Sequence, residues 1–482
     1  MSELLAGAGV LIAAGASAAA ILLPPSRRRS LAMLVAIVLF PVLILGDQWH
    51  TAQIVDLRDD SGRIVALLAI AAVAVGGLAY CFRRWPLLLP LAIVFALPFR
   101  VPLEAGGDTA NLLVPLYLVI AAGVAAVAVR DWGARAAEFS GSWLPRILAA
   151  VVVLYALQTL YSEDFSKGLQ NVCFFLVPFT VAYGLLSDVS WDKRLLRLVL
   201  IVVGVEAVAF VLIGSVEYVT RSLFWNDQVI RSNEFHTYFR VNSMFWDPNV
   251  YGRYLSLVAV LATAALLWVR DRREFALLTV LIGVLWVGLA ETFSQSSYIA
   301  LLGGLAVLAA IRWSLRWTLA AVAVGAVGAV MVVLLAGGSE ITTDRLNVDL
   351  SGRGNLVSGG VDLFAERPLW GYGSGSFQEA YRDHRENKDA PVTVSHTEPV
   401  TILAEQGLIG LVLYVGLLVV ALWTMAAGIR GSPTPARPAV LATFVALLVH
   451  TLAYAGFYED PITWVLLAVG ASLAAPAVRD PA

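Results

Sequence analysis

A polytopic bundle of transmembrane α-helices is the fold class that this sequence predicts, and three observations predict it. Hydrophobic residues make up 59% of the 482 residues and charged residues only 14%, and the mean hydropathy is +0.79. Apolar runs of roughly 17–25 residues, long enough to cross a ~30 Å hydrocarbon layer, recur along the chain. Arginine-rich connections alternate with other polar connections between these runs. The fold class is therefore all-α, with about 12–15 spans and one large, partly helical extracytoplasmic loop.

The apolar runs define the expected spans in order. They lie at 4–23, 31–46, 64–82, 86–99, 111–129, 147–161, 172–187, 196–219, 250–269, 275–291, 297–311, 317–336, 400–424, 438–456 and 462–478. The run at 86–99 is short for a span. The first run precedes Arg27, Arg28 and Arg29, whereas a secretory leader carries its positive charge before its apolar region. We therefore expect residues 4–23 to be a span.

Basic residues mark one side of the predicted bundle. They cluster at 27–29, 83–84, 130–146, 193–197, 270–273, 312–316 and 430–437. Because cytoplasmic loops are enriched in Lys and Arg, we expect this side to face the cytoplasm. The two longest polar segments, 221–249 and 337–399, are then extracytoplasmic. The chain divides into N-terminal helices at 1–220, helices with the first loop at 221–336, a catalytic loop at 337–399 and C-terminal helices at 400–482.

Two short turns on the extracytoplasmic side contain candidate binding residues. Asp247 and Pro248 are typical of a helix start, with Asp247 as the N-cap, and Arg240 and Asn249 flank them. The aromatic residues around this turn are equally consistent with anchoring at lipid headgroups. In the turn ETFSQSSY at 291–298, the serines are expected mainly to cap the following helix. The functional alternative is that Gln295 contacts a polar substrate.

The segment 337–399 is expected to contain a short amphipathic helix. The helix should follow Arg353 and end at Pro368, before a glycine-rich turn at 371–377. An arginine near a helix start can hold an anion through two parallel hydrogen bonds, although an isolated arginine more often faces solvent. Arg353 is therefore a candidate anion ligand.

His396 is the strongest candidate for catalysis, because it lies just before a span whose first turn contains Glu398 and Pro399. The N-terminus of a helix favours a bound phosphate and keeps a nearby histidine neutral, as a general base must be. The alternative is a surface histidine, and we favour that interpretation for His50, His236, His384 and His450. Glu405, deeper in the same helix, is expected either to stabilise the structure or to line a cleft.

Four stretches taken together resemble the O-antigen ligase family of polytopic membrane enzymes. They are Arg240 with MFWDPN at 244–249, TFSQSS at 292–297, the segment from SGR to GYGSGSF at 351–377, and His396-Thr397 followed by Gly407 and Gly410. Their order and spacing agree with the family over roughly residues 235–415. Two positions depart from the family pattern. Gln295 stands where arginine is frequent, and Thr397 stands where Asn or Ser is common.

The resemblance implies a membrane glycosyltransferase without a metal or other cofactor. Such an enzyme moves a glycan from a polyprenyl (undecaprenyl-type) diphosphate carrier to a hydroxyl of a glycan, lipid or wall-polymer acceptor, with inversion, at the outer face of the bacterial cytoplasmic membrane. It implies His396 as the catalytic residue, with substrate-binding residues Arg240, Asn249, Gln295, Arg353 and Glu398. Besides these substrates the expected partners are membrane lipids, and no nucleic acid is expected.

Three alternatives remain at this point. A polysaccharide polymerase that joins lipid-linked repeat units shares the same motifs and differs only in its acceptor. A flippase or transporter would instead show charged groups at the membrane midplane and internal repeats. A peptidoglycan elongase would also combine many spans with a lipid-linked donor. The outer segments contain no Asp-x-Asp pair, so arginines and helix N-termini are expected to neutralise the diphosphate.

Overall fold

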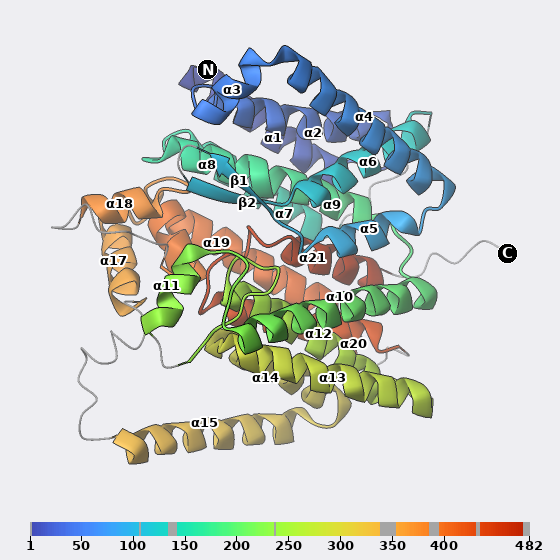
Figure 1. The fold of residues 1–482 in the computed structure, drawn as a ribbon, viewed down its shortest axis with the longest axis vertical. Helices are drawn as coiled ribbons and strands as arrows, with labels where there is room; N and C mark the ends of the chain where they lie inside the picture. Colours follow the sequence, from blue (N-terminus) through green and yellow to red (C-terminus); the bar gives the residue numbers. More distant parts are fainter. Residues whose placement is uncertain are drawn as a thin grey trace.

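The computed structural model describes residues 2–105, 108–133, 142–235, 238–337, 353–384, 395–429 and 434–475. Most of these residues form α-helices, and the long helices run roughly parallel or antiparallel in one bundle (Figure 1). In the described part of the chain, ten helices are long and apolar enough to cross a membrane, and four further apolar helices are shorter. The predicted all-α polytopic bundle is confirmed.

The elements follow one another along the chain with short connections. The first part contains α1 (Glu3–Leu22), α2 (Arg27–Asp47), α3 (Ala52–Asp59), α4 (Ser61–Arg84), α5 (Leu88–Ala96), β1 (Val101–Ala105), β2 (Asp108–Leu112), α6 (Val114–Asp131), α7 (Trp143–Thr159), α8 (Phe165–Asn171), the π-helix η1 (Val172–Leu176), α9 (Val177–Ser187) and α10 (Lys193–Thr220). The second part contains α11 (Asp227–Phe235), α12 (Pro248–Trp268), α13 (Arg272–Thr292), α14 (Gln295–Arg312), α15 (Leu315–Gly337), α17 (Arg353–Glu366), α18 (Phe377–Asp383), α19 (Glu398–Ala426), α20 (Ala436–Thr451) and α21 (Pro461–Ala474).

The expected span at 86–99 is wrong in its length. Its helix, α5, has only nine residues, too few to cross a bilayer. Pro98 and Pro102 follow it, and proline cannot continue a helix because it lacks the amide donor. The chain instead runs on through Arg100 into an antiparallel hairpin in which Val101 pairs with Leu112. Hydropathy alone did not distinguish this half-length helix from a span.

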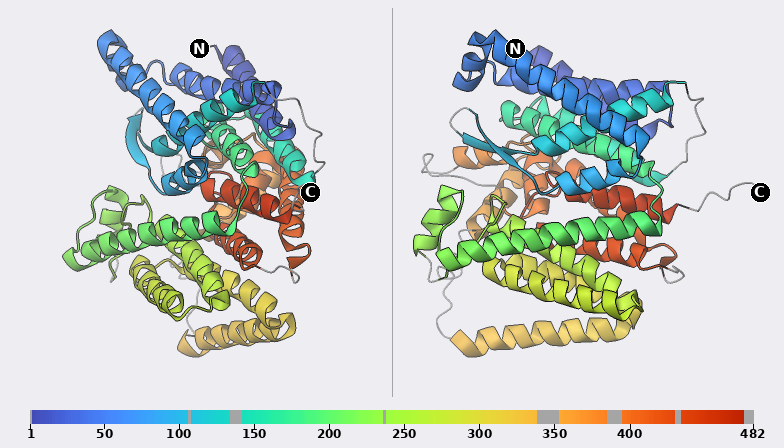
Figure 2. Two further views of the ribbon diagram at one scale, coloured as in Figure 1. Left: turned by 90° about the vertical axis from the view of Figure 1, so that its right-hand side faces the viewer. Right: turned by 45° about the vertical axis from the view of Figure 1, so that its right-hand side comes forward.

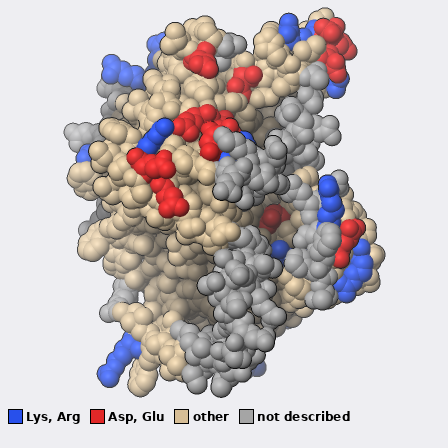
Figure 3. All heavy atoms as spheres, turned by 90° about the vertical axis from the view of Figure 1, so that its left-hand side faces the viewer, with Lys and Arg blue, Asp and Glu red and all other residues tan. Residues whose placement is uncertain are grey.

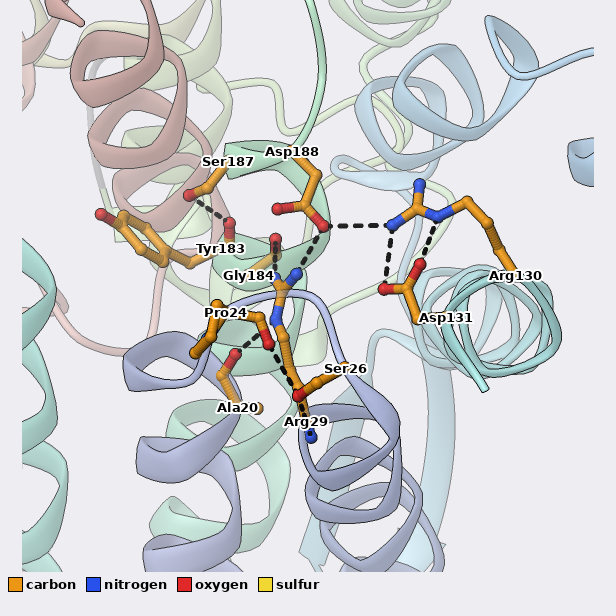
Figure 4. Close-up of polar contacts among 10 residues, drawn as sticks. All are labelled: Ala20, Pro24, Ser26, Arg29, Arg130, Asp131, Tyr183, Gly184, Ser187 and Asp188. Carbon is orange, nitrogen blue, oxygen red and sulfur yellow. Dashed lines mark hydrogen bonds and ion pairs between the residues drawn. The ribbon is translucent and has the colours of Figure 1, made fainter. Parts of the chain in front are cut away.

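One end of the bundle carries the basic clusters, and we call it the arginine end (residues 23–29, 130–133, 188–194, 269–273 and 312–314). Figure 4 shows how Arg29 joins α1, α2 and α9 there. Its Nε donates to Ala20 O at 2.8 Å, Nη1 to Asp188 at 2.6 Å and Nη2 to Gly184 O at 2.8 Å. Arg130 on α6 also pairs with Asp188, at 3.4 Å. All three guanidinium nitrogens of the buried Arg29 are therefore used in holding helices together.

The opposite end, which we call the loop end, gathers residues 221–235, 238–247, 353–384, 395–397 and 452–460. Figures 1 and 2 show α11, α17 and α18 at this end, away from the C-terminus. α15 lies at the edge of the bundle and packs on α14 (Figure 1). Because successive helices alternate in direction, the described parts of the segments 221–249 and 337–399 lie at one end of the bundle, as the charge pattern predicted.

Helix caps explain where the elements at the loop end begin. Asp247 is the N-cap of α12 and accepts from Asn249 N at 2.6 Å, with Pro248 in the first turn, as predicted. Pro399 lies in the first turn of α19, also as predicted. Ser294 occupies the N-cap position of α14, but its side chain makes no cap hydrogen bond. The expectation that this serine caps α14 is therefore wrong, since its hydroxyl is engaged elsewhere.

The glycine-rich turn docks on α19. Gly371 has φ +68° and Gly407 has φ +63°, a region that L side chains rarely adopt. At Gly407 the helix is kinked, and an added Cβ would lie 2.5 Å from the carbonyl carbon of Leu369. Gly373 N donates to Glu405 O at 2.8 Å, and Leu408 N donates to Pro368 O at 2.8 Å. The turn is thus held against the kinked helix by backbone contacts that only glycine permits.

Candidate active site

Polar side chains from several helices meet inside the loop end. They come from the starts of α12, α14 and α19, from the end of α20, and from the connection 452–460. Figure 3 looks onto this end of the molecule, and both acidic and basic atoms are visible at the bottom of a hollow near its middle. These buried polar groups define the candidate site.

Arg240 and Asn249 form the first part of the site. Arg240 Nη2 donates to Asn249 Oδ1 at 3.0 Å, and Arg240 Nε donates to Thr292 O at 3.0 Å. The hydroxyl of Ser294 donates to the same Asn249 Oδ1, at 3.0 Å. Two turns that lie 45 residues apart in sequence are therefore joined. Both Arg240 and Asn249 are half-buried, and the arginine is fixed in direction by these contacts.

A row of side chains connects this cluster to His396. The Nε2 atom of buried His450 lies 3.2 Å from Ser296 Oγ and 3.4 Å from Ser297 Oγ. The ring of Tyr454 lies 5.9 Å from the ring of His450 and 6.2 Å from that of His396, centroid to centroid. His450, expected to be a surface histidine, is instead inside the site. The structure places a tyrosine between the two histidines.

His396 itself has an unusual backbone. Its φ is +61°, a left-handed conformation that is uncommon outside glycine and that clusters at functional sites. The next residue, Thr397, is the N-cap of α19. Ser395 stabilises the turn, because its Oγ donates to Thr397 O at 2.8 Å. The half-buried imidazole is thereby held at the N-terminal end of α19, as the sequence predicted.

An ion pair between Arg253 and Asp460 lies beneath this row. Arg253 Nη2 is 2.9 Å from Asp460 Oδ2, and the two side chains are only 5% and 4% exposed. Asp460 also caps α21, accepting from Ile462 N at 2.8 Å. The other terminal nitrogen of Arg253, Nη1, is buried and has no hydrogen-bond partner among the described residues. An unpaired charged donor in a buried position is costly, so it is expected to face a ligand.

Arg100 adds a second cation to this part of the site. Burial lowers its pKa, while the charge of Asp460 raises the pKa and that of Arg253 lowers it again. Arg100 makes no ion pair or hydrogen bond with any of the described residues. Burial also raises the pKa of Tyr454, and the neighbouring Asp247 carboxylate raises it further. Two guanidinium groups thus share one close carboxylate, beside a phenol that stays protonated, and this arrangement favours an anion.

The predicted site residues differ in where the structure places them. Arg240, Asn249 and His396 lie in this site. Gln295 is exposed in the first turn of α14, and Arg353 is the first residue of α17, with its side chain outside the described part. Glu398 is buried, and its Oε2 accepts from Gly456 N at 2.7 Å and Phe457 N at 3.0 Å. Its observed contacts therefore hold α19 to the connection 452–460.

Sequence reasoning missed four residues of this site: Arg100, Arg253, Tyr454 and Asp460. Arg253 was detectable, because a charged residue inside an apolar span usually faces a partner or a cavity. Arg100 and Asp460 lie outside the predicted spans, where a charge carries no such signal. Only the packing of α5, α12 and the connection 452–460 brings these charges together.

Ten helices long and apolar enough to cross a membrane in the described part of the chain, together with a buried arginine-containing site at one end of the bundle, define a polytopic membrane protein. Residues 280–415 match the family model of the O-antigen ligases (Wzy_C). The matched stretch is similar to the O-antigen ligases, in agreement with the resemblance of the sequence. The matched stretch includes Gln295, the glycine-rich turn and His396, whereas Arg240 and Asn249 precede it. No curated protein matches the chain.

Proposed function

We propose that this protein transfers a glycan from a polyprenyl diphosphate carrier to a hydroxyl acceptor, as an O-antigen ligase-like enzyme at the outer face of the bacterial cytoplasmic membrane. The observation that supports it most directly is the buried Arg253, whose Nη1 has no hydrogen-bond partner among the described residues, with a second guanidinium, Arg100, close to the same Asp460 carboxylate. A diphosphate leaving group needs such fixed positive charge, because negative charge grows on it as the glycosidic bond breaks. The family match over residues 280–415 supports the same class of chemistry.

In the proposed step, the acceptor oxygen attacks the anomeric carbon of the carrier-linked sugar. A new C–O bond forms as the bond to the diphosphate oxygen breaks, with inversion, and polyprenyl diphosphate leaves. His396 takes the acceptor's proton as general base. Its place at the N-terminus of α19 favours the neutral imidazole that this role requires. Arg240, Arg253 and Arg100 neutralise the leaving diphosphate.

Gln295 stands where the family often has an arginine, and Arg253 is a candidate to replace that arginine. The α12 turn that contains Arg253 lies directly on the start of α14, since a Cβ at Gly252 would be 2.6 Å from Ser297 Oγ. We propose that Arg253 supplies the phosphate contact that Gln295 does not.

Exchange of His396 tests the proposed chemistry. A positioned general base contributes about 10²–10⁴-fold to a rate, so His396→Ala should insert normally but transfer little glycan from a lipid-linked donor in a purified assay. His384→Ala is the matched control and should keep its activity. If His396 acts as a base, His396→Gln should not restore transfer. Wild-type rates in His396→Ala would remove this residue from the mechanism.

The acceptor is identified by what accumulates in a strain that lacks the protein. Full-length polymer left on its carrier would show that the protein is a ligase, as we propose. Single lipid-linked repeat units would show that it is a polymerase. Both outcomes use the same chemistry and differ only in the hydroxyl that attacks.

A further inference from the structure

A second polar cavity, of about 250 Å³, borders the start of α19. Its walls come from α7, α8, η1 and α19, from Gly375 and Gln378, and from residues 455–459. At roughly 30 Å³ per water molecule, this volume corresponds to about eight waters, which is the order of size of one sugar ring. Glu398 lines this cavity and accepts from the amides of residues 456 and 457, in the connection that also contributes Tyr454 and Asp460 to the arginine-containing site.

The strongest indication of a ligand is Asn171. This residue is 7% exposed and lines the cavity. Its Nδ2 donates to the hydroxyl of Tyr155 at 2.8 Å, but its Oδ1 is buried without a hydrogen-bond partner among the described residues. An unpaired buried amide oxygen costs stability, about 1–3 kcal/mol. A ligand that donates a hydrogen bond at this point would satisfy it.

The other polar groups of the cavity can both accept and donate. The hydroxyl of Tyr155 already accepts from Asn171, so its proton remains available to a ligand. Glu398 uses one carboxylate oxygen for backbone amides and leaves the other without a donor among the described residues.

The rings of Phe175 and Tyr458 also line the cavity, together with the charged side chains of Lys167, Glu405 and Glu459. Glu405 already accepts from two backbone amides, and Lys167 and Glu459 are exposed. The buried acceptors, the donor and the aromatic faces suit a molecule with hydroxyls around an apolar ring face.

Two irregular stretches of backbone form the cavity wall. The π-helix η1 begins immediately after Asn171, and single π-helical turns are frequent at functional sites. On the other wall, Gln406 directly precedes the kink at Gly407. Departures from regular helix are costly in a bundle and therefore need a reason. Both departures border the cavity.

We propose that this cavity binds a neutral sugar residue of a glycan substrate. A sugar hydroxyl would donate to Asn171 Oδ1 and to the open oxygen of Glu398, and would accept from Tyr155. Glu398 is two residues beyond His396, and Gly456 is two residues beyond Tyr454, so a sugar held here lies next to the proposed catalytic group. That the sugar belongs to a transferred or accepting glycan rests on the proposed function. The binding itself does not.

Ligand-detected NMR on the full-length protein in lipid nanodiscs tests the binding. The probes are methyl glycosides of glucose, galactose, mannose, rhamnose and N-acetylglucosamine, with methylammonium as a cationic probe. Saturation transfer to at least one glycoside is expected. Asn171→Leu should weaken that binding roughly tenfold or more. Gln170→Leu, next in the chain and bonded to Ser166 instead, should leave it unchanged, as should His396→Ala.

Three outcomes would overturn the proposal. The first is that no glycoside shows saturation transfer with the wild-type protein, and the second is that only methylammonium binds. The third is that Asn171→Leu binds the glycoside as tightly as the wild type does and has an unchanged melting temperature. Tyr155→Phe provides a second variant if Asn171→Leu fails to fold, and it should weaken binding in the same direction. If the protein binds a glycoside but has no transferase activity, the proposed function is refuted while the proposed sugar site is still supported.

Transfer kinetics then identify the source of the sugar. If the cavity holds the acceptor, Asn171→Leu raises KM for the acceptor about tenfold and leaves KM for the lipid-linked donor unchanged. If the cavity holds a sugar of the donor, Asn171→Leu raises KM for the lipid-linked donor and leaves KM for the acceptor unchanged. Unchanged values of both KM in a folded variant would contradict a role in the reaction.

Discussion

At the scale of single residues, the hydrogen bonds of two buried arginines distinguish a structural role from a ligand-binding role. Arg29 at the arginine end is 3% exposed and has all three guanidinium nitrogens bonded. Arg253 at the loop end is 4% exposed, yet its Nη1 has no partner in the described part of the chain. Burying a charge is costly unless it is paired and hydrogen-bonded. Full satisfaction of Arg29 indicates a structural role, and the open donor of Arg253 indicates a ligand.

This contrast gives a paired prediction. Arg253→Lys should lower glycan transfer by roughly 10²-fold, because one ammonium group cannot both pair with Asp460 and present a second donor to an anion. Arg29→Lys should lower the melting temperature but leave transfer by the folded protein nearly unchanged. Both variants are measured in the same purified assay, with thermal melts in parallel. Equal activity losses in the two folded variants would contradict the assignment of Arg253 to the site.

The exposed pair of His384 and Glu366 predicts a pH dependence at the loop end. The hydrogen bond to Ala380 O, followed by that to Glu366, raises the pKa of His384. The hydrogen bond from Tyr372, followed by that from His384, lowers the pKa of Glu366. The contribution of His384 is complete below its ordinary pKa of 6.5 and is lost as pH rises through the raised value. The contribution of Glu366 is complete above its ordinary 4.5 and is lost as pH falls through the lowered value.

The pair is therefore expected to be fully formed between about pH 4.5 and 6.5. Amide protection of α17 and α18, measured by hydrogen exchange and corrected for intrinsic rates, should be greatest in that window. His384→Ala should remove this dependence while glycan transfer persists. An identical pH profile in His384→Ala would show that another group controls it.

At the scale of elements, the kink in α19 is the feature on which the loop end depends. Gly407 allows the carbonyls of Ala404 and Glu405 to accept from Tyr372 N and Gly373 N, at 3.0 and 2.8 Å. The side chain of Glu405 extends the same contact by accepting from Gly375 N at 2.8 Å and Phe377 N at 3.2 Å. Of the two roles expected for Glu405, these bonds support the structural one, although the side chain also borders the polar cavity.

Gly407→Ala should therefore destabilise the loop end strongly. A left-handed residue with a Cβ costs roughly 1–2 kcal/mol, and here the Cβ would also lie 2.5 Å from backbone atoms of Leu369. Gly283→Ala on α13 is the control, since a Cβ there meets nothing within 4 Å. Thermal melts of both variants in detergent should show a clear loss for Gly407→Ala only. Equal melting temperatures would contradict the described docking of the turn.

At the scale of the whole molecule, the distribution of charge predicts how the protein lies in the membrane. The arginine end, which contains Arg29 and Arg130 (Figure 4), and the loop end, which contains the candidate site, lie at opposite ends of the bundle. The positive-inside rule predicts that the loop end faces away from the cytoplasm. A lipid-linked donor that has been moved to the outer face would meet the site there.

Cysteine labelling tests this orientation. In a background with Cys81→Ser and Cys173→Ser, His384→Cys should react with a membrane-impermeant maleimide in spheroplasts. Trp313→Cys, at the arginine end and 69% exposed, should react only after permeabilisation. The reverse pattern would place the site on the cytoplasmic face and exclude the proposed mechanism.

The sequence by itself determined the class of protein, the order of the spans and the position of His396 at a helix start. These follow from apolar length, from Asp, Pro and Gly near helix ends and from the placement of arginines, all of which are local signals. Local signals also identified Arg240 and Asn249 as neighbours of one turn. They did not predict the shortness of α5, because the hydropathy of the run 86–99 does not register that Pro98 ends the helix.

The tertiary structure alone decided which side chains meet. Arg100, Arg253 and Asp460 come from segments separated by more than a hundred residues, and no sequence periodicity relates them. It also decided that His450 lies inside the site, and that Asn171 and Glu398 border one cavity. The physical reason is that spans of similar hydropathy can pack in many ways. Their mutual arrangement is selected by close packing and by satisfaction of buried polar groups, and both are properties of the assembled bundle.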